Sequence, residues 1–417
     1  MEKICLLIFL GLVWLGSPVF AQDYLSGDWG GTRSRWGGAG VELGAIYTAD
    51  YFSVVSGGVR QEGALLANLD LTASFDGDKL FKWPGASFFL YILADHGHHQ
   101  NGGLGQQAGD FQGVSNIEAP NAIKIYEAWY EQKFANDAAS FRFGLYDLNS
   151  EFDVIETAGL FINSSFGIGP DYSQSGQNGP SIFPTTSVAL RLAYQTAKNY
   201  YLQLAVLDGV PGDPNNDQGT HIQFNAGDGL LTSAEYGYQQ GGTDDVASPY
   251  GKLAVGVWHY TASFDDLLDT NASGNPVKRH NNQGAYVLGE FQVYREHANS
   301  PQGLAVFARY GVANQNINRI SHYLGAGLVY TGLFAGRDKD QLGLAVAIAY
   351  NGDKYIQKQW NSGTAVDASE TTVELSYRST VLPWLTLQPD IQWIKNPGTN
   401  QTLRDATVIG LRGKVVF

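Results

Sequence analysis

The chain has little of what several protein classes depend on. Its 417 residues include one cysteine, Cys5, and only 16% are charged. No run of about 18 apolar residues follows Ala21, which excludes membrane-spanning helices from the rest of the chain. A chain without a pair of thiols cannot form a disulfide scaffold, and without Cys5 it has no thiolate for catalysis or metal binding. We therefore expect no cofactor.

The charge balance is acidic, with 40 Asp and Glu against 26 Lys and Arg and a formal net charge of −14. Such a chain does not attract nucleic acid, which we exclude as a partner. Aromatic residues make up 13% of the chain, and 51 residues are glycine. Two classes fit these numbers: a secreted all-β protein or an outer-membrane barrel.

The N-terminus has the pattern of a secretory signal. Lys3 supplies a positive charge, residues 4–15 are apolar but too few to span a bilayer, and small residues at Val19 and Ala21 suit a cleavage site. We predict a signal peptide over residues 1–21, which removes Cys5. The rest, residues 22–417, is expected to form a single domain.

Alternation of residue types dominates the rest of the chain. From Leu342 to Tyr350 the even positions are large and apolar, and the odd positions are Gly or Ala. Similar segments centre near Phe89, Tyr130, Phe143, Leu190, Leu202, Val255, Phe291, Val306, Leu328, Leu375, Ile391 and Ile409. Strands of this length without amphipathic helices between them predict an antiparallel, all-β protein.

The last segment, "TVIGLRGKVVF", indicates where the sheet resides. Ile409, Leu411 and Phe417 lie on one face, and Arg412 and Lys414 lie on the other. A final alternating strand with a terminal aromatic resembles the signal that the barrel-assembly machinery reads at the bacterial outer membrane. We therefore expect that machinery, through Phe417, and outer-membrane lipid and lipopolysaccharide as partners. An ordinary half-buried strand ending in Phe is the alternative.

Chain length then sets the size of the barrel. At about 25 residues per strand with its connection, residues 22–417 predict a transmembrane antiparallel β-barrel of about 16 strands. A barrel of this size encloses an aqueous channel. Residues 22–40 precede the first clear strand, as a periplasmic or lumenal segment. Ser26 or Asp28 could cap a short helix there, but a loop explains the segment equally well.

Several stretches resemble the carbohydrate-selective outer-membrane porins of the OprB type. They are "SGDWGGTRSRW" near the start, "LANLDLTASFD" at 66–76, "FQGVSNIEAP" at 111–120, "YEAWYEQKF" at 126–134, the block from 141 to 192, "AVLDGVPGDPNND" at 205–217 and "LQPDIQWIKNPG" near the C-terminus. The resemblance covers almost the whole mature chain. It implies a 16-stranded barrel in the outer membrane through which sugars, glucose above all, diffuse.

The resemblance also implies that residues 147–184 fold inward as a constriction loop. Part of this loop, "FINSSFGIGPDYSQSGQNGPSIFP" at 161–184, is rich in Gly and Pro and has no hydrophobic period. A backbone inside a water-filled lumen can leave regular structure because water and the barrel wall satisfy its polar groups. Its hydroxyl and amide groups would then meet a neutral sugar. A loop on the outer surface is the alternative.

Alternation also assigns lumenal side chains. If Ala128 and Tyr130 face lipid, the intervening residues face the lumen, and the same argument turns Arg142 and Arg191 inward. Because sugars present hydroxyls and C–H faces, charges of both signs with aromatics between them suit a weak sugar site. The predicted constriction comprises Glu127, Trp129, Glu131, Arg142 and Arg191. Arg309, Glu290 and Arg412 are also predicted to point inward. Ordinary wall residues that satisfy one another are the alternative.

The acidic residues Asp147, Glu151, Asp153 and Glu156 allow two interpretations. Paired carboxylates roughly 5 to 10 Å apart could hydrolyse a glycoside, but nothing in the sequence shows that separation, and the porin resemblance implies no enzyme. We expect Asp147, Glu151 and Asp153 to bias the solute path electrostatically or to pair with lumenal arginines. "DHGHHQNGG" at 95–103 holds three histidines in a predicted solvated loop, which gives little support for metal ligands.

The primary prediction is a passive porin for glucose-type monosaccharides or short oligosaccharides, without catalysis. A general small-solute porin and a non-conducting, glycan-binding barrel are the alternatives. The preferred sugar stays open, and so does the choice between a monomer and a homotrimer.

Overall fold

The computed structural model describes residues 23–98, 102–241, 249–298 and 300–417. The predicted signal peptide, residues 1–21, lies outside the described residues. In the described ranges no helix is both long and apolar enough to cross a bilayer.

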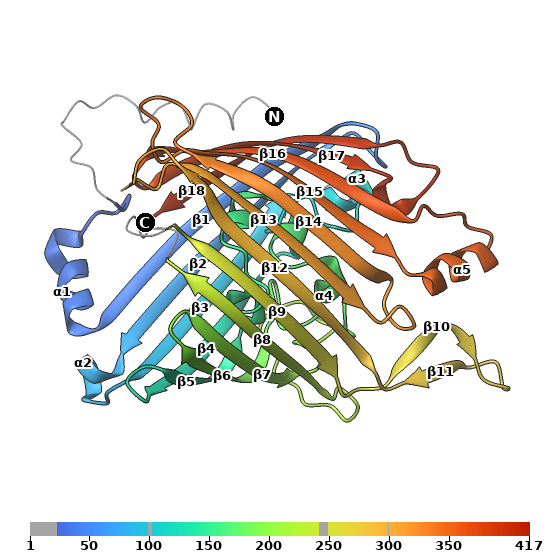
Figure 1. The fold of residues 1–417 in the computed structure, drawn as a ribbon, viewed down its shortest axis with the longest axis horizontal. Helices are drawn as coiled ribbons and strands as arrows, with labels where there is room; N and C mark the ends of the chain where they lie inside the picture. The colour runs from blue at the N-terminus through green and yellow to red at the C-terminus, as the bar shows by residue number, and fades with distance from the viewer. Residues whose placement is uncertain (1–22, 99–101, 242–248, 299) are drawn as a thin grey trace.

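Sixteen strands of the described chain close into one antiparallel barrel, as the sequence predicts (Figure 1). Each barrel strand pairs with its neighbours in chain order, and β1 closes the barrel against β18. The barrel strands are β1 (Val41–Ser56), β2 (Gly63–Asp76), β3 (Ala86–His98), β4 (Ala122–Phe134), β5 (Ala139–Tyr146), β6 (Ser187–Ala197), β7 (Tyr200–Asp208), β8 (Leu230–Gln240), β9 (Gly251–Tyr260), β12 (Asn282–Arg295), β13 (Gly303–Ala313), β14 (Ile320–Thr331), β15 (Gln341–Asn351), β16 (Ser369–Leu382), β17 (Leu385–Lys395) and β18 (Ala406–Val416).

The helices are short and lie in the connections. They are α1 (Thr32–Ala39), α2 (Gly77–Phe81), α3 (Leu104–Ala108), α4 (Pro170–Ser173) and α5 (Asp353–Asn361), with 3₁₀ turns η1 (Trp29–Gly31), η2 (Leu148–Ser150), η3 (Thr157–Leu160), η4 (Ser164–Phe166) and η5 (Pro397–Thr399). The hairpin β10 (Phe264–Thr270) and β11 (Pro276–Arg279) stands apart from the barrel (Figure 1). It lies at the end of the barrel that carries the long loops.

The N-terminal segment holds the seam between β1 and β18. Arg33 Nη2 donates to the backbone oxygen of Phe417 at 2.7 Å, and the Leu25 N–H donates to the Val416 oxygen at 2.8 Å. Helix α1 carries Arg33, which agrees with the helical alternative for residues 22–40. Its N-cap residue is Gly31, although the Asp28 carboxylate accepts from the Ser34 N–H at 2.9 Å.

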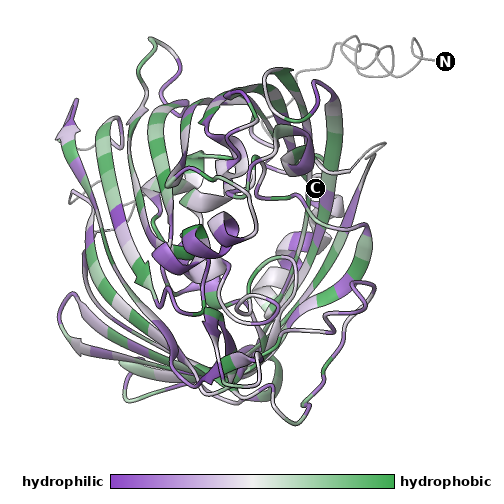
Figure 2. Ribbon diagram, turned by 90° about the vertical axis from the view of Figure 1, so that its right-hand side faces the viewer, coloured by the Kyte–Doolittle hydropathy of each residue, from purple (hydrophilic) through white to green (hydrophobic). Residues whose placement is uncertain are grey.

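The two faces of the wall differ in the way that the alternation predicts. Outward apolar side chains stay exposed: Leu344 is 46% exposed and Ile409 45%. Inward neighbours such as Ala347 are completely buried. Figure 2 shows hydrophobic and hydrophilic residues alternating along the wall strands, with irregular segments inside the barrel. An apolar outer band is typical of a barrel that faces lipid.

The connection between β5 and β6, residues 147–186, lies inside the barrel, and we call it the long inward loop. It carries η2, η3, η4 and α4. Its buried Phe161 packs 5.8 Å from Phe307 of β13, and Tyr172 stacks on Trp258 of β9 at 5.0 Å, both measured between ring centroids. The inward fold is therefore confirmed, and the loop is not an outer-surface loop. Residues 102–121, the short inward loop, bury Leu104 and Val114 in a second core.

The hydroxyl and amide groups of the long inward loop are divided between the wall and the lumen. Not all of them face the lumen, since Asn163, Ser175 and Ser181 are completely buried. Asn163 Nδ2 donates to Gln392 Oε1 at 3.2 Å, and Ser181 Oγ donates to the Tyr146 oxygen at 2.6 Å. These groups attach the loop to the wall, because a buried polar group needs a partner wherever water is excluded.

The histidine-rich stretch is only partly a loop. Asp95, His96 and His98 belong to β3, and residues 99–101 lie outside the described residues. Within the described ranges no group of three or more His, Cys, Asp or Glu could hold a metal ion.

Candidate pore constriction

A β-bulge determines which side chains of β4 point inward. Tyr91 of β3 pairs with Glu127, but the next residue, Ile92, pairs with Ile125, so Tyr126 is an extra residue in β4. As a result Tyr126 and Glu127, neighbours in sequence, are both buried, with exposures of 3% and 7%. Bulges of this kind redirect side chains next to functional sites.

Trp129 is the centre of an aromatic and cationic row that crosses three strands. The Phe89 ring of β3 stacks on Trp129 at 5.0 Å between centroids. The guanidinium carbon of Arg142, on β5, lies 3.8 Å from the centroid of the Trp129 ring. Trp129 Nε1 donates to Glu127 Oε2 at 3.0 Å. The Phe89 ring, the Arg142 guanidinium and the Glu127 carboxylate together hold the Trp129 ring in one orientation.

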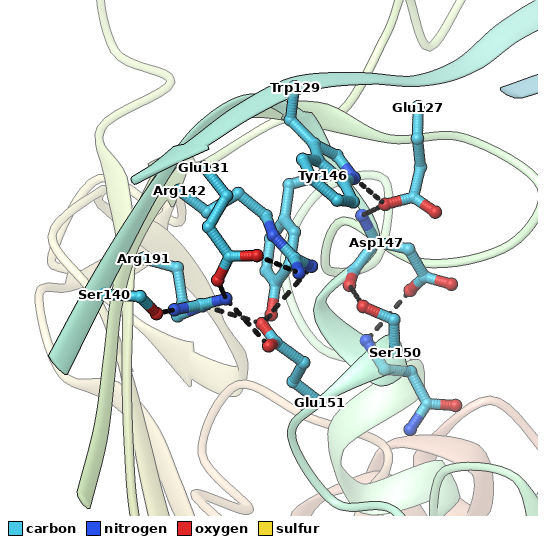
Figure 3. A network of polar contacts seen from close by, with 11 residues as sticks. Glu127, Trp129, Glu131, Ser140, Arg142, Tyr146, Asp147, Ser150, Glu151 and Arg191 are labelled. Carbon is cyan, nitrogen blue, oxygen red and sulfur yellow. Dashed lines mark hydrogen bonds and ion pairs between the residues drawn. The ribbon is translucent and has the colours of Figure 1, made fainter. Parts of the chain in front are cut away.

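Arg191 lies behind this row, within the network shown in Figure 3. It donates from Nη2 to Glu131 Oε1 at 2.8 Å, from Nε to Glu151 Oε2 at 2.8 Å and from Nη1 to Ser140 Oγ at 2.6 Å. The residue is 1% exposed. Arg191 therefore supports two carboxylates from within the wall and has almost no surface for a solute.

Arg142 is the accessible member of the same network. It lies 3.4 Å from Glu131 and 3.6 Å from Glu151, measured between nitrogen and oxygen. Its side chain keeps 13% exposure, and that of Glu151 keeps 20%. The sequence analysis assigned Arg142 and Arg191 to one constriction. In the structure both arginines contact the same two carboxylates, but Arg191 is more deeply buried than Arg142.

Asp147 begins the long inward loop and ties it to β4. Its carboxylate accepts from the Tyr126 hydroxyl at 2.7 Å and from the Asn149 N–H at 2.8 Å, which caps η2. Its own N–H donates to Glu127 Oε2 at 3.3 Å. The loop therefore enters the lumen directly beside the Trp129 row.

Asp153 belongs to a separate, buried centre. It is 1% exposed and receives Arg309 Nε and Nη2 at 2.7 and 2.6 Å. Arg309 also donates from Nη1 to Asp171 Oδ1 at 2.6 Å. Asp153 therefore pairs with a lumenal arginine, which is one of the two interpretations given for the acidic residues. The pair lies apart from the Trp129 row.

Three glutamates of the barrel wall accept hydrogen bonds from backbone N–H groups of the long inward loop. The sequence analysis gave these glutamates no role as loop anchors. Glu374 of β16 accepts from Ile162 at 2.6 Å. Glu290 of β12 accepts from Thr157 at 2.7 Å, and Glu235 of β8 accepts from Asp153 at 2.9 Å. Alternation predicts that such residues point inward, but their loop partners cannot be read from the sequence.

The lumenal face therefore has a covered side and an open side. On β8 to β15 the inward side chains pack under the long inward loop and are buried, including Glu235, Trp258, Tyr286, Glu290, Arg309 and Ala347. On β16 the inward Thr372 and Glu374 are buried in the same way. On β2 to β5, on β18 and at Arg378 near the end of β16, several inward side chains stay half-buried or exposed: Asp70, Thr72, Phe89, Tyr91, Trp129, Arg142, Arg378, Arg412 and Lys414. The solvent-accessible inward side chains therefore lie mainly on the open side.

Comparisons with known proteins agree with this geometry. The family model described as "Carbohydrate-selective porin, OprB family" matches residues 60–417. Porin B of Pseudomonas aeruginosa is 27% identical, with 99% of this chain and 96% of that protein covered. The high-pH structure of Pseudomonas putida OprB superposes with a TM-score of 0.82 at 23% identity, covering 95% of this chain and 99% of the other.

A more distant structure, the outer-membrane channel DcaP of Acinetobacter baumannii, has a TM-score of 0.54 at 12% identity and covers 90% of this chain and 97% of its own. These matches agree with a non-enzymatic outer-membrane channel, so the glycosidase interpretation of the acidic run is not supported. With the family model matching most of the chain, the protein belongs to the OprB family of carbohydrate-selective porins.

Proposed function

We propose that the protein is a passive channel through which neutral, glucose-type monosaccharides, and short oligosaccharides with them, diffuse into the periplasm. Within the constriction predicted from the sequence, the solute contacts Trp129, Arg142 and Glu151, and the buried Glu127 orients Trp129. Arg191 and Glu131 hold these groups from behind. Asp147 fixes the adjacent loop, and Asp153 anchors that loop further along.

The observation that carries this proposal is the accessible row of Phe89, Trp129 and Arg142 with carboxylates at its edges. A sugar hydroxyl can donate to a carboxylate and accept from a guanidinium, and its apolar C–H face suits an aromatic surface. Because the charged groups already pair with one another, each offers only part of its hydrogen-bonding capacity. Binding then stays weak enough for rapid release, which a channel requires.

A general small-solute porin is the second candidate, since the open side would also conduct other small molecules. The non-conducting, glycan-binding barrel is less well supported. The long inward loop covers the β8 to β15 side, and the inward side chains of β2 to β5 keep access to solvent.

The test is single-channel conductance of the refolded protein, residues 22–417, in a planar bilayer. Glucose, a disaccharide and a neutral non-sugar of similar size are titrated in turn. Concentration-dependent block by glucose but not by the non-sugar supports the proposal, and Trp129→Ala should weaken that block. Equal effects of all three solutes would leave a general porin, and no conductance would leave the glycan-binding barrel.

A further inference from the structure

The inward-facing cations fall into three groups. Arg191, Arg309 and Arg412 each lie within 3 Å of a carboxylate oxygen, and Arg142 lies within 3.4 Å. Lys124 and Lys252 lack such a pair but are 5% and 6% exposed and donate to Thr185 Oγ1 and the Val154 oxygen. Lys133 at the end of β4 combines solvent access with no carboxylate oxygen within 4.0 Å in the described part of the chain, and so do Arg378 and Lys414.

Arg378 and Lys414 lie near each other on the open side. In the β17 and β18 pairing, Gln388 is opposite Arg412 and Thr386 is opposite Lys414. On the other edge of β17, Ser379 is opposite Leu387, which places Arg378 beside Gln388. Because adjacent strands lie about 4.8 Å apart and Lys414 is two residues beyond Arg412, the Cα atoms of Arg378 and Lys414 lie roughly 12 Å apart across β17.

The surroundings of the pair leave its positive charge largely uncompensated. Arg378 donates to Gln341 Oε1 and to the Gly159 oxygen, both uncharged acceptors. Lys414 is repelled by Arg378 and by Arg412, which Asp50 neutralises, and is attracted by Asp70 of β2. Asp70 lies two strands from Lys414, across β1, and accepts from the Tyr91 hydroxyl of β3 at 2.7 Å.

Arg378 also opens onto a hollow of about 630 Å³ below the long inward loop. Its lining offers hydroxyl and amide groups, among them Thr331, Gln341 and Thr380, together with the charged residues Lys339, Glu156 and Asp338. A hollow of this volume is in the range that holds a small polar ligand. Arg378 therefore lies beside groups that can bind hydroxyls.

We propose that Arg378 and Lys414 form a carboxylate subsite, so that the channel carries sugar acids, such as aldonates and uronates, besides neutral sugars. This inference rests on the proposed function and extends its substrate class. The guanidinium and ammonium donate to the carboxylate, and Gln388, Thr386 and the lining of the hollow interact with the hydroxyls. Free cations along a lumen lower the barrier for anions without trapping them, because the site is open to water.

The test compares gluconate with glucose in the refolded protein. Reversal potentials in a potassium gluconate gradient give the permeability of gluconate relative to potassium. We expect the double variant Arg378→Gln with Lys414→Gln to lower this ratio by about fivefold. Block and uptake of glucose, measured in parallel, should change by less than about twofold because neither side chain belongs to the Trp129 row.

Two controls separate the subsite from other effects. Lys395→Gln removes the same charge from the outward face of β17 and should change nothing, whereas Arg378→Lys with Lys414→Arg keeps both charges and should keep the gluconate ratio. An unchanged ratio in the double Gln variant would overturn the inference, as would loss of chloride but not gluconate permeability. If the native channel does not discriminate sugars, the proposed function fails, but the gluconate ratio still tests the subsite separately.

Discussion

Charged side chains have different roles on the two sides of the lumen. On β8 to β16 the inward carboxylates and Arg309 bind the long inward loop, and their groups are closed to water. On β2 to β5 and β18 several inward charges, among them Arg142 and Arg412, pair with carboxylates of the wall or the loop entrance and keep partial exposure. The same alternation of wall residues therefore provides a loop anchor on one side and, in our proposal, a solute path on the other, and the position of the loop decides between the two roles.

The largest effect should follow from removing the anchor on the covered side. Arg309→Met leaves Asp153 and Asp171 buried without their cation, which costs about 3 to 5 kcal/mol of unfolding free energy. Thermal unfolding of the refolded barrel in detergent measures it. Arg378→Met is the matched control because Arg378 has no ion pair among the described residues, and it should cost less than about 1 kcal/mol. Equal losses in the two variants would contradict the distinction.

A smaller effect is expected at Glu290. Its carboxylate accepts from the N–H groups of Glu156 and Thr157 and from the Tyr250 hydroxyl. Glu290→Gln replaces one accepting oxygen by a donor, which should cost about 1 to 3 kcal/mol and loosen the loop. Single-channel recordings should then show added conductance noise. Glu296→Gln, in a turn outside the barrel strands, serves as control, and quiet, native-like recordings from Glu290→Gln would count against the anchor.

The two arginines of the Trp129 network should differ in their effects on glucose block and on stability. Arg142→Gln removes an accessible donor and should weaken glucose block by about three- to tenfold while conductance rises. Arg191→Gln should lower the unfolding temperature, and its direct effect on glucose block should be small because the residue is 1% exposed. Titration of glucose against both variants measures the difference. A larger loss of block in Arg191→Gln would reverse the assignment.

The smallest effect concerns pH and the hairpin β10–β11. Although burial opposes it, hydrogen bonds from Lys354 and from the Asp269 and Leu268 N–H groups hold the pKa of Asp266 below its usual range. A lowered pKa adds stability above the unfolded value of about 3.9, and that stability is lost only as pH falls through the folded value. Proteolysis of the hairpin should therefore be constant from about pH 5 to 9.

Asp266→Asn gives the comparison for this pH prediction. Cleavage between Asn271 and Asn275 should rise at every pH in that range because Lys354 and Arg279 lose their shared carboxylate. A pH-dependent rise in the native protein near neutrality would contradict the prediction.

Much of the barrel could be predicted because a strand repeats every two residues. Alternation placed Trp129, Arg142 and Arg309 on the inner face, and length predicted the number of strands. The bulge at Tyr126 could not be predicted, since one extra residue shifts the phase without a local signal. Contacts such as Arg309 with Asp171, 138 positions apart, depend on how the loop folds back. The open side could not be predicted for the same reason, although the alternation in "LDLTA" of β2 predicts that Asp70 and Thr72 point inward.

The most direct test of the open and covered sides uses two threonines. Thr72 of β2 and Thr372 of β16 both point inward, but Thr72 is partly exposed and Thr372 is completely buried. Residues 22–417 contain no cysteine, so Thr72→Cys and Thr372→Cys each introduce a single thiol. We expect a charged thiol reagent to reduce single-channel conductance of Thr72→Cys and to leave Thr372→Cys unchanged. Block of Thr372→Cys with an unreactive Thr72→Cys would contradict the account.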